Sequence, residues 1–425
     1  MIGLLYVCYF AHYGPDASCA LDVPPPYSIH SVAMYGLHRR RFLKLLATSP
    51  LLSGQQGGEV ITDLSQAINV LDFEAVARKL LPPAHFGYLS TGVEDDLTLK
   101  ANVEGFRRYY LRPRRLVDIH KIDLRTEIFG TVWDSPIALA PIGNAKAFHP
   151  GGEIPSTRAA RNKGSLQILS TFTTTPYEEV AATLGRPPWF QLYTTSRWEI
   201  TGKLVQRVEA AGCPVLVLTV DTQAGRRTET FMRSRRLDKR DCVVCHGTSP
   251  VDFYRRKPMF QDIDATDLRS QDPGLNWKHI ELLKKMTKMK LLIKGIETFE
   301  DAKLAVDSGA DGLVVSNHGG RAGETGRGTI ECLPEVIEVT RGRIPVLIDG
   351  GFRRGSDIFK ALALGASAVC IGRPYIWGLA AFGQEGVEKV LDLLRLELEL
   401  VMKQCGTTSL AAIGRNAIAL REGGK

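Results

Sequence analysis

The stretch PVLIDGGFRRGSDIFKALALGASAVCIGRP, residues 345–374, decides the fold class. It holds two short apolar runs, 345–350 and 368–373, on either side of a helical pattern. Each run is a continuous aliphatic series closed by Gly or a polar residue, as expected of a parallel strand that is covered on both faces. Glycine follows the helical pattern just before the second run, which is a common way for a helix to end. The stretch therefore predicts one strand–helix–strand unit of a parallel α/β fold.

Six further apolar runs of the same kind precede this stretch. They lie at 135–141, 165–170, 189–193, 215–221, 291–295 and 312–317, with helical patterns between most of them. Eight strands alternating with helices over about 240 residues predict a (β/α)8 TIM barrel. A doubly wound open sheet is the weaker alternative, because it needs a Gly-rich dinucleotide turn after the first strand, and residues 140–152 do not supply one.

Segments outside the strand–helix repeats suggest a simple domain organisation. Residues 1–58 are irregular and carry three consecutive prolines at 24–26, so they are interpreted as a leader or targeting segment. Residues 59–425 are predicted to form a single barrel domain. Within it, 59–134 is expected to be a helical extension packed against the barrel. The long, basic segment 222–275 follows the fourth strand and is expected to be a lid over the barrel mouth.

The composition is that of an ordinary globular protein, with 44% hydrophobic and 24% charged residues and a net charge of +8 over 425 residues. The basic clusters at 39–44 and 226–240 come with no nucleic-acid motif, so a small anionic ligand or a solvated surface is favoured over nucleic acid. No stretch reaches the roughly 18–20 apolar residues of a membrane span. The cluster at 39–44, Arg-Arg-Arg-Phe-Leu-Lys, resembles the twin-arginine export signal. Twin-arginine export and a cytoplasmic location both stay open.

Polar side chains and glycines stand at the end of every predicted strand, where active sites form in this fold. The candidates are Pro141, Gly143, Ser170, Gln191, Tyr193, Thr219, Asp221, Lys294, Ser316, His318, Arg321, Asp349, Gly351, Arg353, Gly372 and Arg373. A lone His or Asp after a strand is often only a capping or hydrogen-bonded residue. Polar groups at every strand end of one rim, however, need a ligand or a network to satisfy them.

The turns after the last two strands, DGGFRRGSD and IGRP, combine glycines with arginines. Barrels of this kind commonly bind phosphate at this place, through bare backbone N–H groups and positive charge. The alternative is two tight turns that need glycine only for their backbone angles. Ser170, Gln191, Thr219 and Lys294 come one to a strand and suit a flat ring with polar edges.

The motifs SNHGGR, LTVDT, QLY, IKG, DGGFRRG and IGRP resemble those of the FMN-dependent α-hydroxy acid dehydrogenase/oxidase family, in the family's order. This family includes glycolate oxidase, lactate oxidase and mandelate dehydrogenase, and the resemblance runs from about residue 64 to 422. It implies FMN as the cofactor, no metal, and oxidation of an L-2-hydroxy acid of the lactate or glycolate type to the 2-oxo acid. It leaves the electron acceptor open among oxygen, a quinone and a cytochrome, and it implies a homotetramer.

The resemblance also implies a role for each matched residue. His318 would be the base, Asp221 would orient it, and Tyr193 would bond the substrate oxygen. Arg321, Arg227 and Tyr88 would hold the substrate carboxylate. The cofactor-binding residues would be Pro141, Ile142, Gly143, Ser170, Gln191, Thr219, Lys294, Ser316, Asp349, Gly351, Arg353, Gly372 and Arg373. The physical chemistry agrees, because guanidiniums bind an anion in bidentate fashion and a histidine beside a carboxylate accepts a proton near neutral pH.

Four features depart from the family pattern. TVDTQAGRR is one residue short, so Arg226 is an alternative to Arg227. Phe172 stands where some members carry Trp, and AGETG replaces the usual QLD after Arg321. Finally, Cys242-Val-Val-Cys245-His246 matches the c-type haem attachment pattern, so a haem electron-transfer protein is an alternative, beside a metal pair, a disulfide or a chance match. A non-catalytic barrel that binds phosphate ligands is the third hypothesis.

Overall fold

The computed structural model describes residues 60–240 and 249–421. The export signal predicted at 39–44 and the residues Cys242, Cys245 and His246 lie outside this part of the chain.

Eight strands form one parallel sheet that curls into a ring. They are β4 (Ile137–Leu139), β5 (Ile168–Ser170), β6 (Trp189–Leu192), β7 (Val215–Thr219), β8 (Lys290–Ile296), β9 (Gly312–Val315), β10 (Val346–Asp349) and β11 (Ala368–Ile371). Neighbours follow the order β4-β11-β10-β9-β8-β7-β6-β5, and a parallel bridge between Leu139 and Gln167 joins the two ends of this series. Each strand falls within or overlaps one of the apolar runs, so the predicted (β/α)8 barrel is confirmed.

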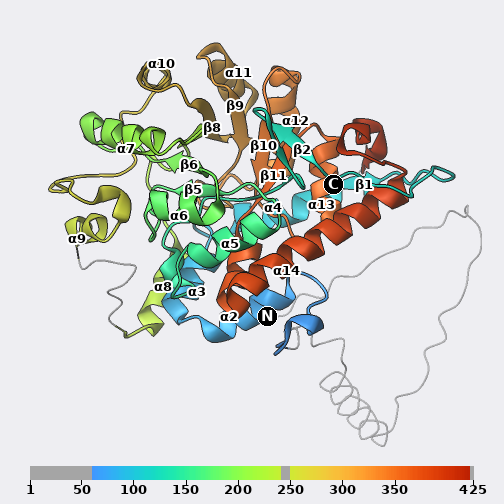
Figure 1. The fold of residues 1–425 in the computed structure, drawn as a ribbon, viewed down its shortest axis with the longest axis horizontal. Helices are drawn as coiled ribbons and strands as arrows, with labels where there is room; N and C mark the ends of the chain where they lie inside the picture. The colour runs from blue at the N-terminus through green and yellow to red at the C-terminus, as the bar shows by residue number, and fades with distance from the viewer. Residues whose placement is uncertain (1–59, 241–248, 422–425) are drawn as a thin grey trace, which may run out of the picture. The chain divides into compact units, whose positions relative to one another are not determined.

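Helices surround the ring of strands and connect them in sequence (Figure 1). They are α5 (Ile154–Asn162), α6 (Tyr177–Leu184), α7 (Trp198–Ala210), α10 (Trp277–Met286), α11 (Phe299–Asp307), α12 (Thr329–Thr340), α13 (Gly355–Ala363) and α14 (Arg373–Cys405). The long α14 has non-helical backbone angles at Phe382 and Gly383, so it consists of two helical segments. In the described residues, no helix is both long and apolar enough to span a bilayer.

Two apolar layers hold the barrel together, because successive strand side chains point to opposite faces. Outward side chains such as Leu216 and Ile293 pack in a large cluster with the helices. Inward side chains such as Val217 and Leu292 pack in a second cluster inside the ring. Trp189, at the start of β6, belongs to this inner cluster, so the end of the barrel at which the strands begin is filled by apolar side chains.

The segment 59–134 is only partly helical, which corrects the prediction. It contains α2 (Asp72–Leu80), α3 (Pro83–Ser90) and α4 (Leu97–Glu104), but also three short strands. Strand β1 (Tyr109–Leu111) pairs antiparallel with β12 (Ile418–Leu420), and β2 (Thr126–Ile128) pairs with β3 (Thr131–Trp133). Strands of three residues are too short to show an alternating pattern in the sequence.

The remaining short elements are 3-10 helices: η3 (Leu64–Gln66), η4 (Gly105–Arg108), η5 (Ala145–Ala147), η6 (Pro258–Phe260), η7 (Leu410–Ala412) and η8 (Arg415–Ala417).

The segment 222–275 carries α8 (Glu229–Leu237), α9 (Pro250–Arg255) and η6 in its described part. It is tied to the extension, since Thr230 Oγ1 donates to Asp96 Oδ2 at 2.7 Å, and to the barrel by an antiparallel bridge between Thr195 and Ser270.

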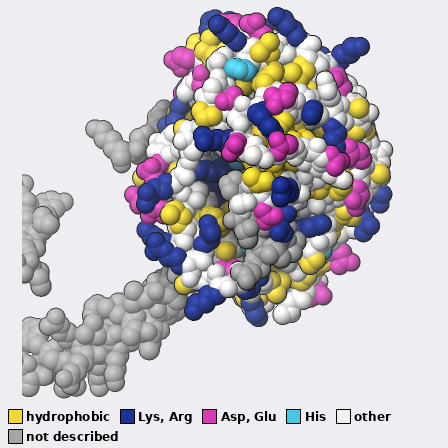
Figure 2. Space-filling view, turned by 90° about the vertical axis from the view of Figure 1, so that its left-hand side faces the viewer, with side chains coloured by type: hydrophobic (Ala, Val, Ile, Leu, Met, Phe, Trp, Pro, Cys, Tyr) yellow, Lys and Arg dark blue, Asp and Glu magenta, His cyan; other side chains and the backbone are white. Residues whose placement is uncertain are grey.

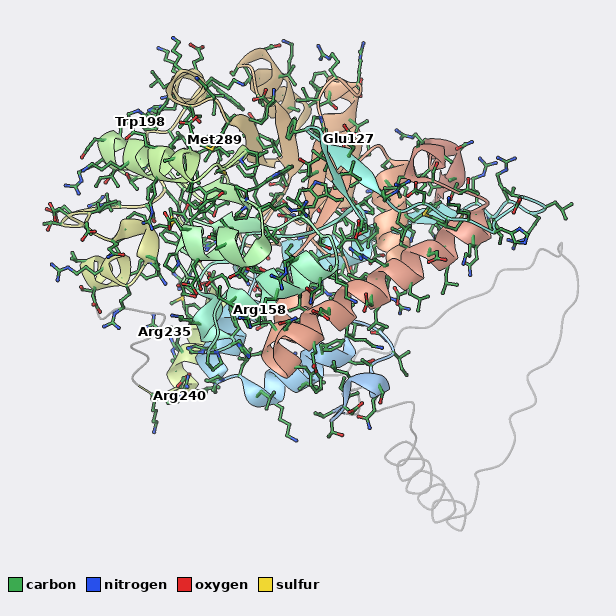
Figure 3. The ribbon with its side chains drawn as sticks, in the orientation of Figure 1. Glu127, Arg158, Trp198, Arg235, Arg240 and Met289 are labelled. Atoms are coloured by element: carbon green, nitrogen blue, oxygen red, sulfur yellow. The ribbon has the colours of Figure 1, made fainter. Side chains whose placement is uncertain are left out.

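Much of the basic charge of this segment is paired locally. Arg233 bonds Glu229 at 2.9 Å, and Arg240, at the outer edge of the molecule in Figure 3, bonds Asp238 at 2.8 Å. Basic and acidic side chains also mix on the face shown in Figure 2, and neither sign forms a continuous patch there.

Candidate active site

A cavity of about 1000 Å³, its open mouth included, lies at the ends of the barrel strands. Residues within or after each of the eight strands contribute to its wall, and α3 adds Tyr88 and Leu89. The sequence-predicted residues on the wall are Tyr88, Pro141, Ile142, Gly143, Ser170, Tyr193, Lys294, His318, Arg321, Asp349, Gly351, Arg353, Gly372 and Arg373. Residues up to 285 positions apart in the chain therefore meet at one place, as expected of strand ends on one rim.

His318 is held between a carboxylate and a phenol. Its Nδ1 lies 2.8 Å from Asp221 Oδ1, and its Nε2 lies 3.2 Å from the hydroxyl oxygen of Tyr193. Burial raises the pKa of Tyr193 far above its ordinary value of 10.0, so this hydroxyl keeps its proton and can donate it to Nε2. The carboxylate of Asp221 accepts, which places the imidazole hydrogen on Nδ1. Nε2 is therefore the basic nitrogen of the ring, and its lone pair points toward the Tyr193 hydroxyl.

The environment keeps His318 neutral and Asp221 ionised near neutral pH. Burial lowers the pKa of His318 below its ordinary 6.5, and the charge of Asp221 offsets this effect only in part. Burial alone would raise the pKa of Asp221, but the charges of His318 and Lys294 outweigh it, and the pKa lies below 3.8. A neutral imidazole beside a fixed carboxylate can accept a proton and hold the resulting charge.

Lys294 is a buried cation at the centre of the site. Its Nζ donates to Ser316 Oγ at 2.7 Å and lies 3.2 Å from Asp349 Oδ2 and 3.8 Å from Asp221 Oδ2. Burial would lower the pKa of Lys294, but the two carboxylates outweigh it and raise the pKa above 10.5. Lys294 therefore stays an ammonium group and places a positive charge on the cavity wall.

Arg321 is fixed with its guanidinium on the wall of the cavity. It donates to the carbonyl oxygen of Leu89 at 2.7 Å and lies over the ring of Tyr88, 5.1 Å from its centroid. Arg226 also lines the cavity, whereas Arg227 does not. The side chain of Arg227 is 71% exposed and bonds Glu229 at 3.3 Å. The structure thus places the alternative residue, Arg226, where the sequence analysis expected Arg227.

The turns after β10 and β11 bring two more buried arginines to the cavity. Arg353 donates to the carbonyl oxygen of Phe352, and Arg373 donates to the carbonyl oxygens of Leu89, Gly319 and Thr91, each at 2.9 Å. Burial lowers the pKa of Arg353 to about 10. In the described residues, neither arginine forms an ion pair with a carboxylate. Two desolvated cations beside the Gly350–Gly351 turn are a donor set that fits a phosphate group.

Five predicted residues do not line the cavity. One is Arg227, and the other four, Asp221, Gln191, Thr219 and Ser316, lie behind residues that do. Gln191 Oε1 accepts from Ser170 Oγ at 3.1 Å, and its Nε2 donates to Thr219 Oγ1 at 3.0 Å. These side chains form a buried polar row across three strands that holds the Ser170 hydroxyl in place.

Several wall residues were not predicted from the sequence. Gln271 reaches the wall from the end of the 222–275 segment, with a left-handed φ of 65° and its N–H donating to Thr194 O at 2.7 Å. Asn144, Phe352 and Cys370 also lie on the wall. Asn144 and Cys370 stand at or beside strand ends, so selecting residues at the ends of predicted strands could have found them. Gln271 lies in a long loop, away from any strand end, and has no such signal in the sequence.

Phe172 lies on the wall at the front of an aromatic cluster. It stacks on Tyr193 with ring centroids 5.3 Å apart and meets Phe253 edge-on at 5.2 Å. Tyr254 and Phe260 lie behind these rings, so the segment 250–260 supports the wall on this side. In the described residues, no group of three or more His, Cys, Asp or Glu side chains could hold a metal ion.

Comparison with known proteins agrees with this geometry. Residues 77–420 match the family model described as FMN-dependent dehydrogenase. A peroxisomal (S)-2-hydroxyacid oxidase of Arabidopsis thaliana is 42% identical over 355 residues, covering 84% of this chain and 97% of the relative. A 2-hydroxyacid oxidase of Dictyostelium discoideum is 40% identical over 375 residues, covering 86% and 94%.

Solved structures of proteins that act on 2-hydroxy acids by name, mandelate oxidase and mandelate dehydrogenase, are also similar to this chain. The crystal structure of a mandelate oxidase is 37% identical, with a TM-score of 0.74, and the similarity covers 84% of this chain and 99% of the other. An active chimera of (S)-mandelate dehydrogenase is 33% identical, with a TM-score of 0.76 and coverage of 83% and 99%.

Proposed function

The chain belongs to the FMN-dependent dehydrogenase family, and we propose that it oxidises an L-2-hydroxy acid to the 2-oxo acid with FMN as its cofactor. One observation carries the proposal: Tyr193 and His318 line the same cavity as Arg321, and Asp221 bonds His318 from behind the wall. A base and a carboxylate-binding group in one cavity suit a substrate that carries a hydroxyl next to a carboxylate.

The residues act on the substrate as follows. Arg321 and Arg226 bind the substrate carboxylate. Tyr88, whose ring lies under the Arg321 guanidinium, lines the cavity beside them. Tyr193 donates a hydrogen bond to the substrate oxygen, and His318 removes a proton at Nε2. Asp221 holds the imidazole in the required tautomer and stabilises the imidazolium that forms.

The donor set of the cavity fits FMN. The cofactor supplies the two-electron acceptor that amino-acid side chains lack. Arg353, Arg373 and the turns at Gly351 and Gly372 would hold its phosphate, and Ser170 with the backbone at 141–143 would contact its ring. Lys294 would place its ammonium group against negative charge on the ring. Gln191, Thr219, Ser316 and Asp349 hold these groups in position.

The electron acceptor is part of the proposal. We propose oxygen as the acceptor, because two relatives are named as 2-hydroxyacid oxidases. A homotetramer and the export signal at 39–44 stay predictions of the sequence. Neither alternative function finds support in the comparisons. The haem alternative depended on Cys242, Cys245 and His246, which lie outside the described residues.

The proposal is tested by an anaerobic substrate screen of the purified, FMN-loaded protein. We expect an L-2-hydroxy acid to bleach the visible absorbance band of the oxidised flavin, and the D-enantiomer to leave this band unchanged. Admitting air should restore the band within the time of mixing. Slow return in air but fast return with a quinone or cytochrome would reassign the acceptor, and a protein that takes up no FMN would overturn the proposal.

The pH dependence of the reaction follows from the environment of His318. The neutral imidazole is the reactive form, and its pKa lies below 6.5, so we expect kcat/KM to rise with pH through a midpoint below 6.5. In Asp221→Asn the imidazole loses the charge that raises its pKa, so the midpoint should move lower still. The imidazolium also loses its counter-charge, so kcat should fall roughly 100-fold or more. Profiles of kcat/KM against pH for both proteins measure this, and an upward shift in Asp221→Asn would contradict it.

A further inference from the structure

The backbone at the proposed base adopts an unusual conformation. His318, Gly319 and Gly320 have φ values of 60°, 67° and 78°, three left-handed residues in a row. Glycine adopts this region freely, but histidine does so only at a cost, so the surroundings must hold it there. The His318 N–H donates to Ser316 Oγ at 3.1 Å, which fixes only the start of the turn.

Asn317, just before His318, closes the rest of the turn. Its side-chain Oδ1 accepts the Gly320 N–H at 2.9 Å, and its backbone oxygen accepts the N–H groups of Gly320 and Arg321 at 3.0 and 3.1 Å. The side chain of Asn317 is itself held by Asn102 of α4. Asn102 Nδ2 donates to Asn317 Oδ1 at 2.8 Å, and Asn317 Nδ2 donates to Asn102 Oδ1 at 3.0 Å. Both residues are buried, with 1% and 0% exposure, so solvent cannot replace these bonds.

Asn102 also contacts the turn that carries the proposed phosphate site. A Cβ atom added at Gly351 would lie 1.9 Å from the backbone oxygen of Asn102, so the two backbones are in direct contact. Asn102 Oδ1 also accepts the N–H of Thr329 at 3.0 Å. One residue of the N-terminal extension therefore touches both the turn of His318 and the turn of Gly351.

The segment AGETG, residues 322–326, departs from the family pattern and fixes α4 to the loop that follows His318. The N–H groups of Leu97 and Thr98, at the start of α4, donate to the two carboxylate oxygens of Glu324 at 2.6 and 3.1 Å. The preceding residue, Asp96, makes no side-chain capping bond to the helix. Glu324 thus replaces the usual helix cap, and a carboxylate at this end also suits the helix dipole. The loop from 317 to 326 therefore bonds α4 near both of its ends, through Glu324 at the first turn and through Asn317 at Asn102.

We propose that Asn102 is a positioning residue for the base. It acts through Asn317 and holds the His318 turn at a fixed position relative to the proposed phosphate-binding turn. This inference rests on the proposed function of His318. It assigns a role to the N-terminal extension, because α4 joins two pieces of the site that belong to different barrel strands.

The test is Asn102→Ala, which removes the amide and leaves the side chains of His318 and Arg321 chemically unchanged. We expect kcat to fall about 10- to 100-fold with full FMN content. The midpoint of the His318 titration, followed by NMR of 15N-labelled imidazole, should move toward 6.5 as the ring leaves its buried position. With substrate deuterated at C2, the kinetic isotope effect on kcat should not decrease. Asn102→Asp keeps the oxygen that accepts from Thr329 but replaces the Nδ2 donor to Asn317 Oδ1 by a second oxygen, so kcat should fall and the titration should shift in the same direction as in Asn102→Ala. Val103→Ala, on the next and more exposed residue of α4, is the matched control and should change none of these values.

The outcomes separate the inference from the proposed function. A kcat loss together with a shifted His318 titration supports it. An unchanged titration overturns it, whether or not kcat falls, because the ring would then not depend on Asn102. If Asn102→Ala does not fold, the same two measurements on Asn102→Asp decide. If the wild-type protein oxidises no 2-hydroxy acid, the proposed function fails, and the titration alone then decides whether Asn102 positions the ring.

Discussion

Replacing His318 with Gln is expected to lower kcat by about 100- to 10,000-fold while the protein keeps its FMN. A glutamine amide can still bond to Asp221 but cannot accept a proton, so the change removes the base and little else. Steady-state kinetics and the ratio of flavin absorbance to protein absorbance measure the two parts. Because no predicted phosphate-binding group is altered, the flavin content should stay at the wild-type value.

The same substitution at an exposed histidine is the control for His318→Gln. The side chain of His120 is 97% exposed, and its ring bonds the carboxylate of Asp118. His120→Gln should therefore leave kcat unchanged. If His318→Gln kept a large share of the wild-type kcat, another group would have to remove the proton, and the assignment of the base would be wrong.

Arg321→Lys is expected to raise KM about 10- to 100-fold, the range that corresponds to losing one charge-assisted hydrogen bond. The guanidinium of Arg321 uses one N–H for the carbonyl oxygen of Leu89 and lies over the ring of Tyr88, so its position is fixed before substrate binds. A lysine ammonium has the charge but not the planar fork, and it cannot make both contacts while binding a carboxylate in bidentate fashion. The measurement is KM for the acid found in the substrate screen.

Substitutions at Arg226 and Arg227 distinguish the two candidate partners of Arg321. Arg226 lines the cavity, so Arg226→Lys should also raise KM. Arg227 is exposed and bonds Glu229, so Arg227→Lys should leave KM near the wild-type value. The reverse result would return the carboxylate-binding role to Arg227 and would mean that the segment closes differently over bound substrate.

The sequence predicted the eight strands well because the signals for them are local. Each strand is a run of aliphatic residues between turn residues, and both features can be read within about ten positions. The β2–β3 hairpin was missed because it lacks such a local signal. Its strands have three residues each and show no alternation of apolar and polar residues. The aromatic cluster behind Phe172 was also missed, because Phe253 and Phe260 lie in a segment whose path has no local signal.

The sequence by itself determined the barrel and most of the rim, because a parallel barrel brings all strand ends to one edge whatever its loops do. From the strand ends alone, His318, Asp221, Lys294 and Arg321 could be placed in one site. Only the tertiary structure decided which arginine faces the cavity, that Gln271 reaches its wall, and that Asn102 bonds Asn317 across 215 residues of chain. These contacts depend on how loops and the extension pack on the barrel, and the energy of that packing comes from residues distant in sequence, which no local pattern records.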